Sequence, residues 1–181
     1  EDEDDGRGTG ALRCVYGANE KSCVQGFTLA NGFTLEGDDS SGSYRKGGIV
    51  FVAGGANQFQ VLDCTLSNGW AARGAIGLGG VYRRCLITGQ DESGAVGTHF
   101  REGVAFLGCV YVNNAGANFN QPFFTDSAAN AYKICHCTVF GKTGKAVIHS
   151  NYIVRNSLVG DTANLTGTDV AGTLKTTSSP T

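Results

Sequence analysis

Short segments with the same order of apolar and polar positions recur along most of this chain. Each begins on a large apolar residue, passes through a glycine or polar residue, and ends on a second large apolar residue five positions after the first. Most copies are followed by turn-forming residues such as Asn68-Gly69 or Gly89. The six copies are residues 24–29, 61–66, 82–87, 106–111, 134–139 and 153–158. A constant order at this spacing is typical of solenoid repeat proteins.

A second apolar segment precedes the first in most repeats. Its copies are residues 48–51, 74–77, 94–97, 121–124 and 145–148. Two β-rich segments in a fixed order predict a chain that returns to the same place in each cycle, so that each strand pairs in parallel with its equivalent about 4.8 Å away. We therefore expect an all-β protein, a right-handed parallel β-helix of about six coils, over residues 10–164. Residues 1–9 form an acidic tail, and residues 165–181 form a tail or a capping, partner-contacting segment.

The two apolar ends of each segment should both point inward, which requires a bend between them. They are five residues apart, and strict alternation would place them on opposite faces. The bend falls at Gly26, Asp63, Arg84, Gly108, His136 and Arg155. The next residue re-enters the core. This predicts an internal ladder of Cys64, Cys85, Cys109 and Cys137, with Phe27 below it and Asn156 above it.

This repeat resembles that of the pectate-lyase-like superfamily of right-handed parallel β-helix proteins, in which ladders of Asn or Cys beside the turns are frequent. The resemblance covers roughly residues 10–160 as a repeat pattern. It implies the fold but not a function, because one fold hosts many activities. The motifs Gly-Gly-Ile-Val at 47–50 and Gly-Ala-Ile at 74–76 are also similar to those of bacterial surface β-helices.

The chain has seven cysteines, which suggests a disulfide framework or a metal site until the repeat is considered. The four ladder cysteines occupy equivalent positions, so we expect buried free thiols that pack as small apolar side chains. Cys14 and Cys23 lie outside the ladder, and they either form a disulfide in an oxidising compartment or stay free. The Cys135-x-Cys137 spacing does not match a zinc site, and no metal or cofactor is expected.

Candidate catalytic residues are sparse. The outward neighbours in the second apolar segment are not ionisable, whereas glycoside hydrolysis requires two opposed carboxylates and β-elimination requires a base with a cation. If the protein is an enzyme, its candidates are His99, Arg101, Glu102 and Arg84, with Asp63 nearby. The alternative interpretation is a solvated loop and a ladder of charges between successive coils.

The same outward positions predict an apolar strip along the molecule. Its large members are Ile49, Phe51, Phe124 and Ile148. A strip of this kind usually contacts a partner. The cover could be residues 165–181, the loop at residues 33–47, or a neighbouring chain. The two ends of the coil stack also leave unpaired strand edges, which favours assembly with further subunits.

Charge and composition narrow the function classes. The formal net charge is −2, and no block of Lys or Arg occurs, so nucleic-acid binding is not expected. No apolar run is long enough to predict a membrane-spanning helix. The sequence contains no methionine, so Glu1 is not a translation start, and we expect either a mature product after removal of a secretory leader or a segment of a longer protein.

Our leading hypothesis is a non-enzymatic extracellular or cell-surface β-helix with a structural or adhesive role. It would form homo-oligomers, rods or filaments through its open coil ends and its apolar strip. One alternative is a polysaccharide lyase or hydrolase, or a carbohydrate-binding β-helix, with a polysaccharide as partner. The other is a trimeric segment of a phage spike.

Overall fold

The computed structural model describes a little over half of the chain in thirteen stretches. They are residues 11–17, 21–34, 46–53, 59–71, 74–90, 100–101, 105–115, 132–143, 146–148, 152–160, 163–165, 172 and 174–175. Within these stretches the protein is all-β and has no α-helix. The acidic tail expected at residues 1–9 lies outside them.

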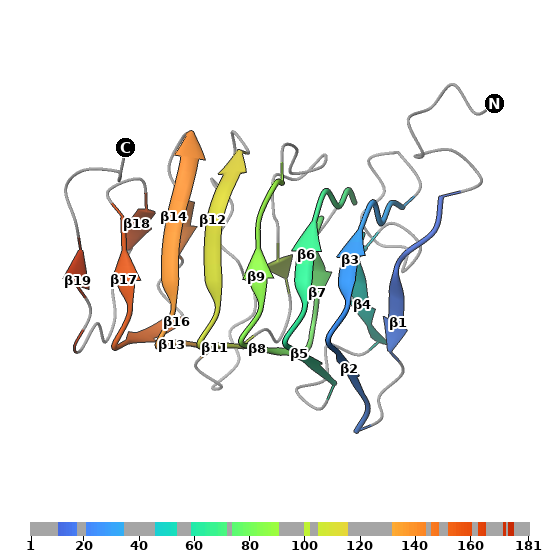
Figure 1. The fold of residues 1–181 in the computed structure, drawn as a ribbon, viewed down its shortest axis with the longest axis horizontal. Helices are drawn as coiled ribbons and strands as arrows, with labels where there is room; N and C mark the ends of the chain where they lie inside the picture. Colours follow the sequence, from blue (N-terminus) through green and yellow to red (C-terminus); the bar gives the residue numbers. More distant parts are fainter. Residues whose placement is uncertain are drawn as a thin grey trace.

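Three parallel sheets make up the fold (Figure 1). Sheet A contains β1 (Val15–Gly17), β4 (Val50–Val52), β7 (Gly77–Leu78) and β10 (Phe100–Arg101). Sheet B contains β2 (Cys23–Gln25), β5 (Gln60–Leu62), β8 (Val81–Arg83), β11 (Ala105–Leu107), β13 (Tyr132–Cys135) and β16 (Tyr152–Arg155). Sheet C contains β3 (Thr28–Ala30), β6 (Thr65–Ser67), β9 (Leu86–Ile87), β12 (Val110–Ala115), β14 (Thr138–Thr143), β17 (Leu158–Val159) and β19 (Leu174–Lys175). A further parallel pair joins β15 (Ala146–Ile148) and β18 (Ala163–Leu165).

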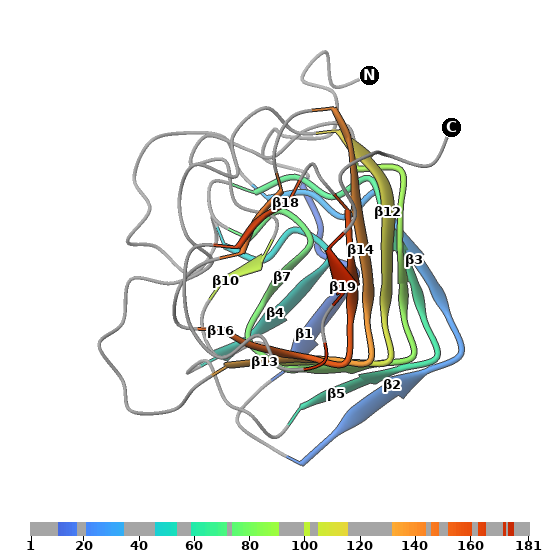
Figure 2. The same ribbon diagram turned by 90° about the vertical axis from the view of Figure 1, so that its left-hand side faces the viewer.

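In the first four repeats, from β1 to β12, the chain passes through sheets A, B and C in that order and then returns to sheet A. Each strand therefore pairs with its equivalent one cycle later, as β2 does with β5 and β5 with β8. Seen along the stack, the three sheets form the sides of a roughly triangular coil (Figure 2). This arrangement is consistent with a parallel β-helix. We call one passage through the sheets a repeat, and the first repeat is β1, β2 and β3.

The turn from sheet B to sheet C is the most regular feature of the repeat. Its first residue has a positive φ in each of six repeats, namely Gly26, Asp63, Arg84, Gly108, His136 and Asn156. This left-handed conformation is easy for glycine and tolerated by Asn and Asp, and it costs other residues about 1–2 kcal/mol. It turns the chain within two residues, so that the next side chain points into the core.

The last copy of this turn corrects the predicted alignment by one residue. Ile134 pairs with Val154 rather than Ile153, and Cys135 pairs with Arg155. Asn156, not Arg155, therefore occupies the turn, and Ser157 rather than Asn156 follows Cys137 in the buried column. A one-residue slip of this kind reverses every side chain of a strand, so the buried Val154 and Val159 decide the register.

The core runs between the three sheets along the whole stack. Its central part is aromatic: Tyr82, Phe100 and Phe106 pack with ring centroids 4.7–5.4 Å apart. The Tyr82 hydroxyl is fully buried, and it has no hydrogen-bond partner in the part of the chain that the structure describes. It points toward Gly77, where a Cβ atom would clash with it. Gly77 is therefore required at this position of sheet A by the tyrosine beside it.

Buried amides support the turn that leaves sheet C. The Gln90 side chain accepts a hydrogen bond from the Gly69 N–H at 2.7 Å and donates one to the Gly69 carbonyl. Asn114 accepts from the Gln90 N–H at 3.0 Å and donates to the Ile87 carbonyl at 2.9 Å. These bonds satisfy backbone groups that would otherwise be buried without a partner at the corner.

Candidate functional site

The cysteine ladder lies in the buried column behind the turn between sheets B and C. Cys64, Cys85, Cys109 and Cys137 are 2–3% exposed, and all four thiols are free. Each thiol points at the carbonyl two residues before it, for example Cys64 at Leu62 O at 3.1 Å and Cys137 at Cys135 O at 3.2 Å. The thiols therefore help to satisfy the carbonyl groups of the turn.

Hydrogen bonds between neighbouring thiols disfavour ionisation in the middle of the ladder. The bond to Cys109, together with burial, raises the pKa of Cys85 far above the ordinary thiol value. The bond to Cys137 is the main cause that raises the pKa of Cys109 to about 12. The pKa of Cys137 is lowered because its sulfur accepts from Cys109. Protonated, buried thiols such as those of Cys85 and Cys109 are poor nucleophiles, and burial of all four side chains is consistent with a packing role.

Both ends of the buried column differ from the prediction. Phe27 is 59% exposed instead of lying below Cys64 in the core, because the first repeat is the end of every sheet and no described segment packs on its outer side. At the other end Ser157 occupies the slot, 4% exposed. The Ser157 hydroxyl accepts from the Cys137 N–H at 3.1 Å and donates to the Arg155 carbonyl at 2.9 Å.

The remaining three cysteines are free thiols in this structure. Cys14 and Cys23 are both exposed and do not form a disulfide. The Cys14 thiol donates to the Ala30 carbonyl at 3.3 Å, at the far end of β3. Cys23 is the first residue of β2, seven positions before Ala30 and on the other side of the corner between sheets B and C. Cys135 is half-buried on the outward side of β13.

Asp63 and Arg84 form an ion pair across two successive repeats at the corner. Arg84 Nε and Nη2 donate to the two Asp63 oxygens at 2.6 and 2.9 Å, and Gln25 Nε2 donates to Asp63 Oδ2 at 2.9 Å. The Arg84 hydrogen bond is the main cause that lowers the Asp63 pKa. A carboxylate that is held ionised and occupied at both oxygens is a weak general base. This geometry matches the expected ladder of charges between successive repeats and does not match a pair of general acid and general base.

The other catalytic candidates are not brought together in the described part of the chain. Arg101 ends β10, where it pairs with Leu78 of sheet A. His99 and Glu102 lie outside the described residues, as does the side chain of Arg101. Arg84 is on a different face, at the corner of sheets B and C. No group of three His, Cys, Asp or Glu side chains with the geometry of a metal site occurs among the described residues.

The predicted apolar strip is wrong for the two members that can be examined. Ile49 is fully buried in the main core, beside Gly48, whose backbone lies against the Trp70 and Ala75 carbonyl oxygens. Phe51 points away from the main core but is only 5% exposed. The Tyr16 ring lies 5.4 Å from it and the Arg13 guanidinium 4.7 Å from its centroid. Phe124 and the side chain of Ile148 (in β15) lie outside the described residues.

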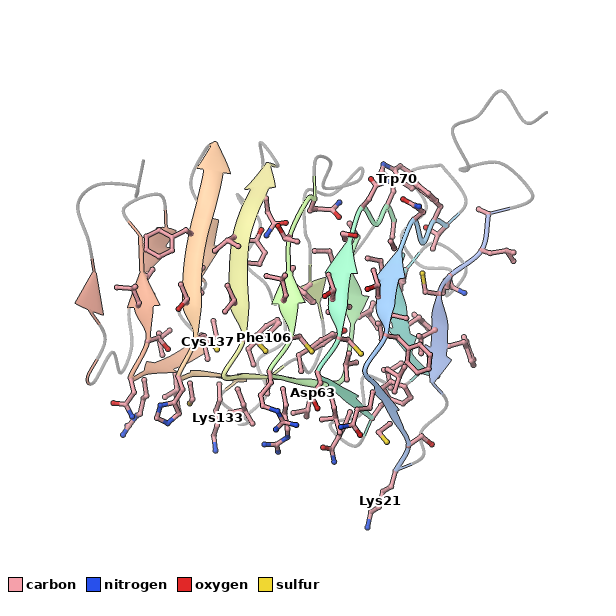
Figure 3. The ribbon with its side chains drawn as sticks, in the orientation of Figure 1. Lys21, Asp63, Trp70, Phe106, Lys133 and Cys137 are labelled. Atoms are coloured by element: carbon pink, nitrogen blue, oxygen red, sulfur yellow. The ribbon has the colours of Figure 1, made fainter. Side chains whose placement is uncertain are left out.

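A cationic face that the linear sequence does not reveal covers the outside of sheet B and its corner. Its members are Arg83, Arg84, Lys133, His136 and Arg155. Strand pairing places Arg83, Leu107, Cys135 and Arg155 in one outward column. Asp63 is the only carboxylate among the described outward positions of sheet B and its corner. Four basic residues against one carboxylate give the face a net charge of +3, in a chain whose net charge is −2. Figure 3 shows Lys133 and Asp63 pointing away from the body on this side.

The first repeat exposes most of the large apolar side chains found on the described surface. Leu12 is 78% exposed, Tyr16 63% and Phe27 59%, whereas Leu86 and Val110 on the flank are 37% and 38% exposed. Strands β1, β2 and β3 are each the end strand of their sheet. Exposed apolar side chains thus coincide, at one end of the stack, with strand edges that no described strand pairs with.

Comparisons with protein-family models, with curated proteins and with solved structures found no match to this chain. The resemblance to the pectate-lyase-like superfamily therefore stays a prediction, and the described architecture supports only the coarser statement of stacked parallel strands. No helix in the described part is long and apolar enough to cross a membrane.

Proposed function

We propose that this protein is a non-enzymatic structural or adhesive subunit of an extracellular or cell-surface assembly, built on a right-handed parallel β-helix of about six coils. Its copies stack head to tail, with the first repeat of one copy against the last repeat of the next. The right hand follows from the general rule for crossovers between parallel strands in one sheet.

The open first repeat carries this proposal. Soluble proteins usually protect edge strands with charge, proline or a covering segment, because bare edges pair with other chains. Here the edge repeat instead presents Leu12, Tyr16 and Phe27, three of the most exposed apolar side chains described. A surface of this kind favours burial against a partner.

A second copy of this chain fits the open end best. The end presents three strand edges at once, in a triangular arrangement (Figure 2). Only another stack with the same cross-section can pair with all three in parallel. In sheet B the inward column would also continue across the junction, because Val24 begins the column that Val154 ends.

Association at increasing protein concentration tests the proposal. We expect sedimentation velocity to detect growing species, and electron microscopy to show rods. Phe27→Lys should weaken association at least about tenfold, since it places a charge in a desolvated contact. Leu86→Lys makes the same change on the flank of the stack and should have no effect.

A strictly monomeric protein at the highest attainable concentration would contradict the proposal. Compact trimers that never elongate would favour the phage-spike alternative. Cleavage of a polysaccharide that His99 or Arg101 substitutions abolish would favour the enzyme alternative. If Phe27→Lys and Leu86→Lys weakened association equally, the first repeat would not be part of the interface.

A further inference from the structure

We propose that Asn31 is a site of self-modification, at which the folded protein loses the side-chain amide nitrogen and converts this residue into aspartate and isoaspartate. The backbone nitrogen of Gly32 is the nucleophile, and water completes the reaction. The proposal concerns the chemistry of one turn and does not depend on the head-to-tail association.

Two Asn-Gly pairs occupy equivalent positions in successive repeats. Asn31-Gly32 follows β3, and Asn68-Gly69 follows β6. A glycine after asparagine favours this chemistry, because no side chain shields the glycine nitrogen. Both asparagines have the left-handed conformation, with φ of 59° and 48°. The dipeptide and its backbone conformation therefore do not distinguish the two sites, whereas their surroundings do.

The first difference lies in the nucleophile. The Gly69 N–H donates to the side-chain oxygen of Gln90 at 2.7 Å, which holds this nitrogen in a buried hydrogen bond. Gly69 is the residue of the second repeat that lies beside Gly32, and it has no side chain that could accept a hydrogen bond in the same way. Among the described residues, none accepts a hydrogen bond from the Gly32 N–H. Attack by the Gly32 nitrogen therefore breaks no described hydrogen bond, whereas attack by the Gly69 nitrogen breaks one.

The second difference lies in the amide that is attacked. Asn68 Nδ2 donates to Asn31 Oδ1 at 2.7 Å. Negative charge develops on this oxygen when a nucleophile adds to the amide carbon, and a donor that already points at the oxygen stabilises that charge. The side-chain oxygen of Asn68 accepts from no described residue. The pair of asparagines thus activates Asn31 and leaves Asn68 without such help.

The third difference is the place of each turn in the stack. Strand β3 is the end strand of sheet C, with β6 as its described neighbour, whereas β6 lies between β3 and β9. The turn must open locally to bring the glycine nitrogen onto the asparagine Cγ. An end strand opens at a lower free energy than a strand paired on both sides, so opening also favours Asn31.

The reaction needs water and no oxidant or reductant. The Gly32 nitrogen gives its proton to water and forms a bond to Cγ of Asn31, while the bond from Cγ to Nδ2 breaks and this nitrogen leaves as ammonia. The product is a cyclic succinimide. Water then opens the ring at Cγ, which gives aspartate, or at the backbone carbonyl, which gives isoaspartate.

Isoaspartate routes the main chain through the Asn31 side chain, immediately before a contact between repeats. Phe33 pairs with Trp70 there, and the Trp70 N–H donates to the Gly32 carbonyl at 3.0 Å. The modification lengthens the chain at this point, so it should loosen the pairing of the first repeat with the second.

The test follows both sites in the unmodified full-length protein, incubated in mildly alkaline buffer with and without urea. Peptide mass spectrometry measures the conversion of each asparagine, and an isoaspartate-specific methyltransferase assay identifies the isoaspartate product. In the folded protein we expect Asn31 to react at least about tenfold faster than Asn68, since one extra hydrogen bond and a harder opening protect Asn68. In urea the two rates should become similar, because the two sites share the same dipeptide.

Asn68→Gly tests the activating hydrogen bond. Glycine keeps the left-handed turn and removes the donor, so Asn31 should react about fivefold more slowly. Hydrogen exchange of the β3 amides is the control, because it shows whether the variant opens as the unmodified protein does. Asn31→Gly should abolish the product at the first site.

Three outcomes would overturn the proposal. They are equal or faster conversion of Asn68 in the folded protein, no conversion of Asn31 in the folded protein, and a preference for Asn31 that persists unchanged in urea. An unchanged Asn31 rate in Asn68→Gly, with unchanged hydrogen exchange in β3, would overturn the role given to the Asn68 amide.

Discussion

Four residues other than glycine adopt the left-handed conformation at the turn from sheet B to sheet C. They are Asp63, Arg84, His136 and Asn156, with φ between 49° and 54°. Gly26 and Gly108 occupy the same position in other repeats, so the turn itself does not require a side chain. At Asp63 and Arg84 the ion pair between the two side chains offsets part of the conformational cost.

Replacing His136 with glycine should stabilise the protein by about 0.5–1 kcal/mol, because His136 is exposed and its φ of 54° is unfavourable for any residue with a Cβ atom. Urea unfolding followed by circular dichroism measures the change. Lys133→Gly, in the neighbouring strand β13, is the control and should destabilise by a similar amount. A His136→Gly protein less stable than the unmodified one would show that the imidazole makes a contact stronger than the backbone cost.

The ion pair at the corner should make stability depend on pH in a defined direction. The Arg84 hydrogen bond holds the folded-state pKa of Asp63 below its unfolded value of about 3.9. The ionised carboxylate therefore stabilises the fold above that value, and the contribution is lost as the pH falls through the lowered folded pKa.

Asp63→Asn tests this contribution, because asparagine tolerates the same backbone conformation but lacks the charge and one of the two acceptor oxygens. We expect the variant to be less stable than the unmodified protein at pH 7, and the difference to be smaller at pH 2, below the unfolded pKa of Asp63. Parallel urea titrations at the two pH values provide the measurement. A difference that is the same at both pH values would assign the effect to packing instead of ionisation.

At the scale of strands, the sequence predicts the repeat better than its surface. Periodic pairs of apolar residues, with the turn residues that follow them, are sufficient to predict stacked parallel strands. The column of cysteines indicates where the turn lies. The last repeat was misaligned because Ile153 and Val154 are both β-branched and apolar, so both fit the inward position. The register depends on which of Arg155 and Asn156 adopts the left-handed turn, and asparagine does so more easily.

The apolar strip and the cationic face show why surfaces were harder to predict. Alternation along β4 correctly points Phe51 away from the core, but exposure depends on Tyr16 and Arg13, which come from the preceding repeat. The cationic face is invisible to a search for charge runs, because its residues are spread over more than 70 positions and only strand pairing assembles them. The sequence signal that could have revealed the cationic face was the presence of Lys or Arg at equivalent positions of different repeats.

The rate at which a thiol reagent labels each cysteine should depend on where that cysteine lies in the sheets. A thiol-specific alkylating reagent at pH 8 should label Cys23 rapidly, because it is exposed. Cys14 should react more slowly, because burial raises the pKa of its thiol, which also donates to the Ala30 carbonyl. Cys64, Cys85, Cys109 and Cys137 should react only after unfolding, since they are buried and the pKa of Cys109 is raised to about 12. Peptide mass spectrometry distinguishes the sites, and a urea-unfolded sample is the control. Rapid labelling of Cys85 or Cys109 in the native protein would mean that the ladder opens locally.

At the scale of the whole molecule, a stack of repeats has no single centre of stability. Each repeat contacts only its neighbours, so an inner repeat is held from two sides and an end repeat from one. Among the described strands, β1, β2 and β3 have partners only on the side of β4, β5 and β6. The central strands β5, β6, β8 and β9 are paired on both sides and enclose the central part of the core.

Amide hydrogen exchange should therefore be fastest in β1, β2 and β3 and slowest in β5, β6, β8 and β9, when the protein is dilute. The same measurement at high concentration adds a second expectation, because head-to-tail stacking would give the first repeat its missing neighbour. Protection should then rise in β1, β2 and β3, while the central strands change little. Phe27→Lys is the control and should keep the first repeat unprotected at both concentrations. First-repeat amides that are already as slow as those of β8 in dilute solution would mean that this end is covered within a single copy, which would remove the physical basis for stacking.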